Sequence, residues 1–255
     1  MLDGEDDYAI LPFAEHDYTF PRNTNEFTVE VWFYPKAEPE LGKSNIILSQ
    51  QVRFSLNPDN CLVPLDKKDQ VCASGVAYLE GAAHGIRITD AAMKKDQWNY
   101  MAVIFKDSTF YLAYNDQIIR GQKRDFMNVV AGDLRLPEGF KNFCVGGYAE
   151  DLLIPKAYFH GEIDAIRFSN IARYDLPAEV GTSPFEPPHR FSSDAHTLAF
   201  WDFNDKAGAN HFEDASGNGK KLIGLNGATT SGALAVNPAN TSIATTWGQV
   251  KSESF

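Results

Sequence analysis

Acidic and amide side chains gather in a few short segments that could bind a metal ion. Asp214, Ser216 and Asn218 alternate along a loop that Gly217 and Gly219 allow to turn tightly. Calcium prefers six to eight oxygen ligands from carboxylates and turn carbonyls, and this loop offers several of them. It lacks the length and the final glutamate of an EF-hand loop. Tight turns select the same residue types, so ordinary turn chemistry is the competing interpretation.

A second acidic segment lies at the start of the chain. Asp3, Asp6 and Asp7 stand within five positions of one another, and Asp164 follows much later. If the first and last strands of the fold are neighbours, these carboxylates can approach the loop at Asp214. The predicted ligands of a structural calcium ion (Ca2+) are Asp3, Asp7, Asp164, Asp214 and Asn218.

Aromatic rings beside polar groups are the other combination that could carry a function. Sugars present apolar C–H faces and many hydroxyl groups, so their sites combine rings with carboxylates, amides and backbone groups. Trp32 and Tyr34 share a strand face with Glu30 and Thr28, unless a strap or loop covers that face. The loop that begins at Tyr148 is a second candidate. The predicted ligand-binding residues are Trp32, Tyr34, Tyr148, Asp151 and Tyr158.

The composition excludes several classes of partner. The chain has 34 acidic and 23 basic residues and a formal charge of −11, which argues against nucleic acid and anionic lipid as partners. Hydrophobic residues make up 44 % of the 255 positions, enough for a full core and too many for a wholly disordered chain. No apolar run is long enough to predict a membrane-spanning helix.

Alternating hydrophobic residues predict β-strands along most of the chain. One face of residues 27–34 reads Phe, Val, Val, Phe, and Pro35 ends the segment. About a dozen such runs are separated by turn residues, and Asn115 and Asp116 predict a tight hairpin turn. No amphipathic helical run of comparable strength is present, so the predicted fold class is all-β, an antiparallel sandwich or barrel.

Two stretches interrupt the strand pattern. Residues 176–196 are rich in proline and predict an extended strap, and residues 228–255 read as a low-complexity tail or linker. Residues 1–227 are assigned to one domain, which residues 197–227 close as a hairpin.

The cysteines and the start of the chain give weaker signals. Cys61 and Cys72 flank a charged turn, so a hairpin-closing disulfide and unpaired thiols are both open, and a third cysteine leaves an odd count. The absence of Cys-x-x-Cys disfavours a zinc knuckle. The first residues do not resemble a signal peptide, so either the protein stays where it is made or the sequence derives from a longer exported chain.

Several short motifs in a fixed order make the chain resemble one protein family. They are Asp3–Ala9, Phe27–Pro35, Gln97–Phe105, Tyr111–Gln117, Gly161–Phe168, Phe200–Asn204 and Asp214–Gly219. Together they are similar to the LamG-like jelly-roll family of the concanavalin A-like lectin/glucanase superfamily, over about residues 1–225. The resemblance implies two packed antiparallel sheets, often with a structural calcium ion. Trp98 and Trp201 lie in motifs typical of the core.

One motif departs from the usual order. In many relatives the stretch similar to residues 200–219 precedes the opening strand, whereas here it comes last. It could belong to a following repeat. A lone hairpin is marginally stable in water, so we expect this stretch to pack onto the same sandwich.

The resemblance also bears on catalysis. Retaining glucanases of the superfamily carry a Glu-x-Asp-x-x-Glu strand motif, and Glu162 and Asp164 match its first two acidic positions. Arg167 stands where the second glutamate would be, and a guanidinium has no proton to exchange near neutral pH. The chain is therefore predicted not to be an enzyme.

The resemblance implies a non-catalytic module that is secreted or on the cell surface. Carbohydrate binding is the first functional hypothesis. The alternative is a structural or adhesive module that binds a surface protein and has no sugar site, with neighbouring domains in a longer chain. A glycoside hydrolase, the third, would require a second carboxylate near Glu162 in space.

Overall fold

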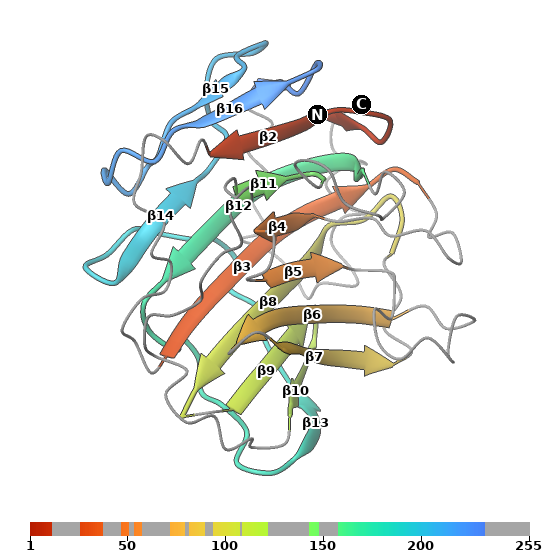
Figure 1. Cartoon of the computed structure of the whole chain (residues 1–255), viewed down its shortest axis with the longest axis vertical. Helices are drawn as coiled ribbons and strands as arrows, with labels where there is room; N and C mark the ends of the chain where they lie inside the picture. The colour runs from red at the N-terminus through yellow and green to blue at the C-terminus, as the bar shows by residue number, and fades with distance from the viewer. Residues whose placement is uncertain are drawn as a thin grey trace, which may run out of the picture.

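The computed structural model consists of β-strands arranged in two antiparallel sheets, which Figure 1 shows as overlapping layers. None of the described residues forms a helix that could cross a membrane. The described residues are 1–11, 26–37, 47–50, 54–57, 72–79, 82–89, 94–107, 109–121, 143–147 and 158–232.

Sheet A has eight strands. They are β1 (Leu2–Asp3), β3 (Glu26–Pro35), β8 (Asn99–Lys106), β9 (Thr109–Tyr114), β10 (Gln117–Arg120), β12 (His160–Ser169), β13 (Gly181–Pro184) and β14 (Thr197–Trp201). Their order is β1-β12-β3-β8-β9-β10-β13, and β14 pairs with β12 beside β1. Sequence neighbours β8, β9 and β10 form a meander, whereas β3 and β12 meet from opposite halves of the chain.

Sheet B also has eight strands. They are β2 (Tyr8–Leu11), β4 (Leu48–Gln50), β5 (Phe54–Asn57), β6 (Cys72–Leu79), β7 (Ala82–Thr89), β11 (Phe143–Val145), β15 (His211–Phe212) and β16 (Leu222–Leu225). Their order is β15-β16-β2-β11-β4-β5-β6-β7. The all-β fold predicted from the alternation pattern and the two antiparallel sheets implied by the family resemblance are both confirmed.

The main core lies between the sheets. The alternating residues at positions 27, 29, 31 and 33 of β3 are all buried there, as the strand pattern predicted. Phe143 of sheet B stacks on Trp201 of sheet A, with ring centroids 5.6 Å apart. Trp201 is 1 % exposed, which confirms its prediction as a core residue. Such aromatic contacts tie the layers together because each ring buries a large apolar area.

The Pro-rich strap covers the outer face of sheet A. Phe185 and Phe191 pack against a second buried cluster that includes Tyr100. Part of the strap becomes strand β13, which pairs with β10 through contacts such as Ser183 with Ile118. The strap therefore extends the sheet at one edge and shields its outer surface.

The last strands complete the two sheets. β14 pairs with β12, and β16 pairs with β2, so residues 197–225 are part of the same sandwich. Ordered packing continues past the predicted boundary at residue 227. Ala228 is buried, and Thr230 exchanges backbone hydrogen bonds with residues 208 and 209. The start of the predicted tail therefore belongs to the domain up to residue 232.

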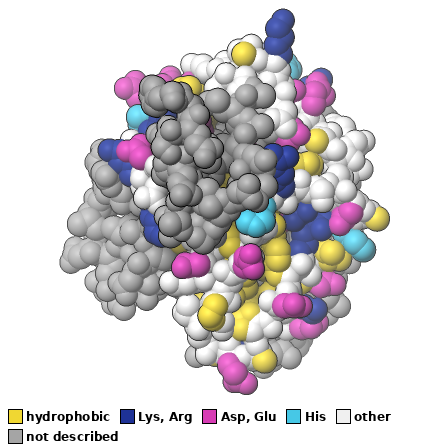
Figure 2. Space-filling view, turned by 180° about the vertical axis from the view of Figure 1, so that it is seen from behind, with side chains coloured by type: hydrophobic (Ala, Val, Ile, Leu, Met, Phe, Trp, Pro, Cys, Tyr) yellow, Lys and Arg dark blue, Asp and Glu magenta, His cyan; other side chains and the backbone are white. Residues whose placement is uncertain are grey.

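The surface seen from behind carries a mixture of charges (Figure 2). Acidic and basic side chains are both scattered over the described part of this face, and a hydrophobic patch lies between acidic groups in its lower half. Cys144 is buried in β11. The two alternatives for Cys61 and Cys72, a disulfide or unpaired thiols, concern residues or side chains outside the described part of the chain.

Candidate functional site

A hollow of about 70 Å³ lies beside β12 and β14, near both ends of the described chain. Its polar side chains include three carboxylates and an amide, and its apolar lining includes Leu2, Ile163 and Phe203. We call it the carboxylate pocket, defined by Glu162, Asp164, Asp202 and Asn204. Its volume exceeds that of one water site, so it can take one edge of a small ligand.

A β-bulge places Asp164 at the pocket. Along β12, Ile163 pairs with Phe33 and Ala165 pairs with Trp32, so Asp164 is an extra residue without a partner on β3. Bulges break the regular alternation of a strand and redirect one side chain. This irregularity allows Asp164 to line the same hollow as its neighbour Ile163.

A strained turn places the other acidic group. Phe203, two residues after the end of β14, has a φ of 48°, a left-handed conformation that is uncommon for residues other than glycine. Asp202 accepts hydrogen bonds from the side-chain amide of Asn204 at 2.9 Å and from its backbone N–H at 3.3 Å. These bonds hold the turn and present Asp202 and Asn204 to the hollow together.

The electrostatics of the pocket are dominated by Asp164. Burial raises the pKa of Asp164 to about 6, the positive charge of Arg190 opposes this shift, and the negative charge of Asp202 adds to it. No hydrogen bond to the Asp164 carboxylate comes from the described residues. Glu162 differs, because it forms an ion pair with Lys36 at 2.6 Å. The Asp164 carboxylate is thus partly removed from water, and its oxygens can accept hydrogen bonds from a ligand.

Two aromatic residues stand beside the pocket. Tyr34 of β3 is opposite Glu162 of β12, and its ring packs against the edge of Trp98 with centroids 5.5 Å apart. Burial raises the pKa of Tyr34, and the charges of Asp96 and Glu162 add to this effect. Tyr34 is partly exposed, whereas Trp98, which also lines the pocket, is buried as predicted. Tyr34 therefore offers an accessible ring next to the acidic groups.

Trp32 and Tyr158 do not join this site. Trp32 is 8 % exposed and donates a hydrogen bond from Nε1 to the carbonyl of Pro188 at 3.1 Å. The strap therefore covers the ring, which corrects the exposed platform predicted for Trp32. Tyr158 is partly exposed and packs near Tyr8, with centroids 6.1 Å apart. The remaining predicted ligand-binding residues, Tyr148 and Asp151, lie outside the described residues.

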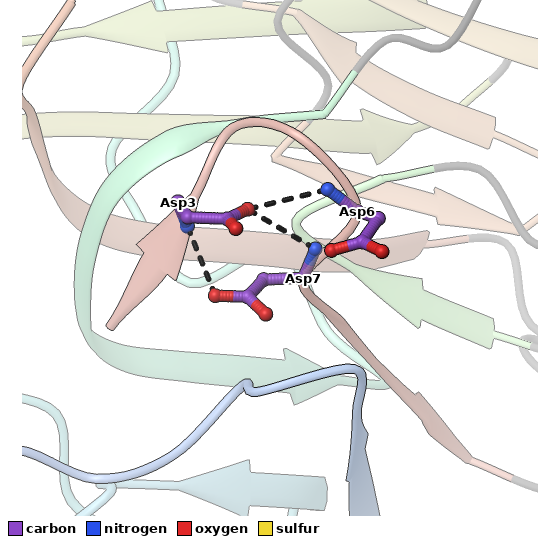
Figure 3. Close-up of side chains that lie close together, drawn as sticks. All are labelled: Asp3, Asp6 and Asp7. Carbon is purple, nitrogen blue, oxygen red and sulfur yellow. Dashed lines mark hydrogen bonds between the residues drawn. The ribbon is translucent and has the colours of Figure 1, made fainter.

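The opening acidic segment forms a compact loop (Figure 3). Asp3 Oδ1 accepts a hydrogen bond from the backbone N–H of Glu5 at 2.8 Å. It also accepts hydrogen bonds from the backbone N–H groups of Asp6 and Asp7, at 3.2 and 3.3 Å, which Figure 3 shows. Asp7 Oδ2 accepts the N–H of Asp3 at 3.1 Å. One carboxylate oxygen from each of Asp3, Asp6 and Asp7 lies within 4.8 Å of the others. The loop thus converges three carboxylates, although exposed acidic groups also cluster without a metal.

The chemistry of this loop fits calcium. Burial raises the pKa of Asp7, and the charges of Asp3 and Asp6 add to it. A bound cation would relieve this repulsion, and carboxylate oxygens are the ligands that calcium prefers. Asp6 was not among the predicted ligands, although its place between Asp3 and Asp7 could have indicated it.

The Asp214 loop is separate from this cluster. Asp214 accepts backbone N–H groups from Phe200, Ser216 and Lys220, each at 3.0 Å. Asn218 donates its side-chain amide to the carbonyl of Thr197 at 2.9 Å. In the described residues the only group of three or more candidate ligands, counting His, Cys, Asp and Glu, is Asp3, Asp6 and Asp7. The five predicted calcium ligands therefore lie in three separate places. Asp3 and Asp7 are in the opening loop, Asp164 lines the carboxylate pocket, and Asp214 and Asn218 are in the later loop, where backbone N–H groups already donate to Asp214.

The chain belongs to the concanavalin A-like lectin/glucanases superfamily, whose laminin G family model matches residues 3–176. This confirms the family that the sequence motifs resemble. No curated protein sequence matches the chain.

One solved structure has a similar fold. A candidate carbohydrate-binding protein from Bacteroides ovatus has 15 % identity and a TM-score of 0.53, covering 85 % of this chain and 55 % of that one. Domains LG4-5 of the mouse laminin alpha1 chain have 14 % identity and a TM-score of 0.42, covering 74 % of this chain and 46 % of that one. This chain thus spans about half of the Bacteroides protein, and at this identity the likeness concerns the fold alone.

Proposed function

We propose that the protein is a non-catalytic carbohydrate-binding module that acts outside the cell. The carboxylate pocket is the observation that carries this proposal. It brings Asp164, Asp202 and Asn204 together beside the accessible ring of Tyr34. A few convergent polar groups next to apolar surface are typical of small-ligand sites. Membership of a superfamily of lectins and glucanases supports the same class of ligand.

The polar groups of the pocket and the ring of Tyr34 would make different contacts with a sugar. The carboxylates of Asp164 and Asp202 accept hydrogen bonds from hydroxyl groups, and the amide of Asn204 is held by Asp202. Hydrogen bonds to charged groups contribute about 1.5–3 kcal/mol each, so two or three of them would give a weak but specific complex. Tyr34 supplies an apolar surface for the C–H face of a ring.

Arg167 has a structural role that supports the non-catalytic assignment. Its Nε donates to Glu30 Oε1 at 2.7 Å in the buried layer beneath the strap. The position that a glucanase would give to its second glutamate is thus occupied by half of an internal ion pair.

Glycoside hydrolysis is the second candidate function, and one observation favours it. The pocket places Asp164 and Asp202 around the same hollow as Glu162, which meets the condition that the sequence left open. A carboxyl group with a pKa of about 6 can also carry a proton near neutral pH. Lys36 opposes this role, because it holds Glu162 in an ion pair.

Affinity electrophoresis through gels containing neutral, acidic or basic polysaccharides tests the proposal. We expect at least one glycan to retard the wild-type chain and the Asp202→Asn variant to migrate faster in that gel. Glu179→Gln, an exposed site outside the pocket, is the matched control for the loss of one negative charge. Retardation by none of the glycans would reject carbohydrate binding. Release of reducing ends from a bound glycan, lost in Asp164→Asn, would replace the non-catalytic role with hydrolysis.

We also propose that Asp3, Asp6 and Asp7 bind a structural calcium ion. The convergence of their oxygens and the raised pKa of Asp7 support this assignment. The ion would stabilise the junction between β1 and β2, since Asp3 ends one strand and Asp7 precedes the other. It would have no part in the carboxylate pocket.

A further inference from the structure

Two of the three carboxylates of the carboxylate pocket form no ion pair within the described residues. Lys36 neutralises Glu162, but neither Asp164 nor Asp202 has a cationic partner within ion-pair distance in that part of the chain. The negative charge of Asp202 raises the pKa of Asp164, and the positive charge of Arg190 lowers it by more without forming an ion pair with Asp164. Two carboxylates that share a partly desolvated hollow favour a ligand that brings a positive charge.

We propose that the pocket selects sugars that carry a free, protonated amine, as in a glucosamine oligosaccharide. The inference rests on the proposed carbohydrate-binding function and specifies its ligand class. A hydroxyl group can donate a hydrogen bond to Asp164 or Asp202 but leaves their charges in place. An ammonium group donates up to three hydrogen bonds and neutralises the charge, and such charge-assisted bonds are about twice as strong as neutral ones.

The size of the site agrees with this ligand. A hollow of about 70 Å³ admits the amine and the adjoining edge of a sugar, while the rest of the ring remains outside. Tyr34 packs against Trp98, which lines the pocket, and its partly exposed ring is the apolar surface proposed for the C–H face of the sugar. Acetylation of the amine would remove the charge and add a bulky acyl group where the hollow is narrow.

The proton equilibrium of Asp164 gives the binding a defined pH dependence. The groups that face it are Arg190 of the strap and Asp202 after β14. On the remaining side of the pocket lie Glu162 with Lys36 and the amino end of the chain at Met1. Because the pKa of Asp164 is about 6, lowering the pH through 6 neutralises the acceptor and weakens the bond to an ammonium. Affinity for the amino sugar should fall on this acidic limb in the wild type and stay flat in Asp164→Asn.

Isothermal titration with a glucosamine tetramer and with its fully N-acetylated counterpart tests the inference. At a pH of about 6.5 we expect the wild type to bind the amine form at least about tenfold more tightly, a difference of about 1.4 kcal/mol. Asp164→Asn and Asp202→Asn should each lose about tenfold for the amine form and less than about twofold for the acetylated form. Glu179→Gln should bind both as the wild type does. Thermal melting of each variant shows whether it is folded.

The outcomes separate this inference from the function on which it rests. Equal affinity for the two tetramers, or equal losses for both in Asp164→Asn, would overturn the amine selectivity while carbohydrate binding stands. If neither tetramer nor any other glycan binds, both proposals fail. Tight binding of ethylamine at the same concentrations would also overturn the inference, because the sugar would then contribute nothing.

Discussion

Two regions beside sheet A bury acidic side chains in opposite ways. Beneath the strap, Glu30 is 0 % exposed and accepts hydrogen bonds from Arg167, Tyr100 and Tyr174. In the carboxylate pocket, Asp164 accepts none from the described residues. A buried charge whose bonds are all made within the chain stabilises one arrangement of that chain. A desolvated charge without such bonds costs stability, and an external ligand can recover that cost.

The network at Glu30 also explains why the strap stays closed. Arg167 donates to the strap carbonyl of Ser192 at 2.9 Å, and its guanidinium lies 4.9 Å from the ring centroid of Phe191. Burial and the nearby charge of Glu30 raise the pKa of Tyr100 and Tyr174, so both phenols keep their protons and remain donors. The strap therefore covers the outer face of sheet A around Glu30 and Trp32, whereas Tyr34 on the same face stays partly exposed.

The largest effect is expected from Arg167→Met, which removes the cation from the network. Glu30 would remain buried without its ion-pair partner, and breaking such a pair typically costs about 3–5 kcal/mol. Urea unfolding monitored by tryptophan fluorescence measures this loss. Lys106→Met is the matched control, because Lys106 is exposed and lies 4.0 Å from Glu26, so its loss should cost less than about 1 kcal/mol. If the two variants lose similar amounts of unfolding free energy, the buried ion pair of Glu30 is no more important to stability than an exposed one.

Calcium binding should have the next largest effect on stability. The loop of Asp3, Asp6 and Asp7 would then be an acidic site whose charge is neutralised by a metal ion. At a concentration one hundred times its dissociation constant, the ion should stabilise the fold by about 2.7 kcal/mol. Melting temperatures in calcium, in magnesium and in chelator measure this. Asp6→Asn should abolish the calcium shift without breaking the hydrogen bonds that Asp3 accepts. A melting temperature unchanged by calcium and by chelator would exclude a structural ion at this loop.

Asp164→Asn is expected to stabilise the unliganded protein at neutral pH. The pKa of Asp164 is about 6 in the folded protein, above the ordinary value of 3.8. The Asp164 carboxyl group therefore binds its proton more tightly in the folded protein than in the unfolded chain. The contribution of Asp164 to stability therefore falls as the pH rises from about 4 to about 6. Above that range the variant should be more stable by up to about 3 kcal/mol, and near pH 4 the difference should fall below about 1 kcal/mol. Paired unfolding curves at both pH values measure it, and a constant difference would contradict the assignment.

The smallest effect is expected from Trp32→Phe. The variant loses the hydrogen bond to Pro188 and part of the ring, and the expected cost is about 1–2 kcal/mol in unfolding free energy. Glycan affinity should not change, because the strap covers this ring, whereas Tyr34→Ala should weaken binding at the pocket. A loss of glycan affinity in Trp32→Phe with Tyr34→Ala unaffected would move the site to the outer face of sheet A.

Much of the fold could be predicted from local patterns. Alternation along residues 27–34 predicted a strand with one core face, and Asn115 and Asp116 predicted the hairpin between β9 and β10. These signals succeed because the two-residue period of a strand and the conformations of a tight turn depend on neighbouring residues only. The ordered motifs also identified the family, which the match over residues 3–176 confirms.

The site was harder to predict because its parts come from distant segments. Glu162 and Asp164 were read as members of a strand motif, while Asp202 drew attention only as part of a family motif. A bulge in β12 and a left-handed residue at Phe203 bring them to one hollow, and neither feature has a clear signature in the residue types. Asn204 was missed for the same reason, whereas the place of Asp6 between Asp3 and Asp7 could have indicated it.

The amino-acid sequence by itself determined the strands, the turns, the family and the absence of the second glutamate of the glucanase motif, since these depend on residue type and local spacing. Only the tertiary structure decided which polar residues are available. It buried Trp32 beneath the strap, engaged Asp214 with backbone donors and left Asp164 beside Asp202 without a donor from the described chain. The physical reason is that burial and hydrogen-bond satisfaction depend on groups far apart in sequence, and these two properties separate a structural side chain from one that can bind a ligand.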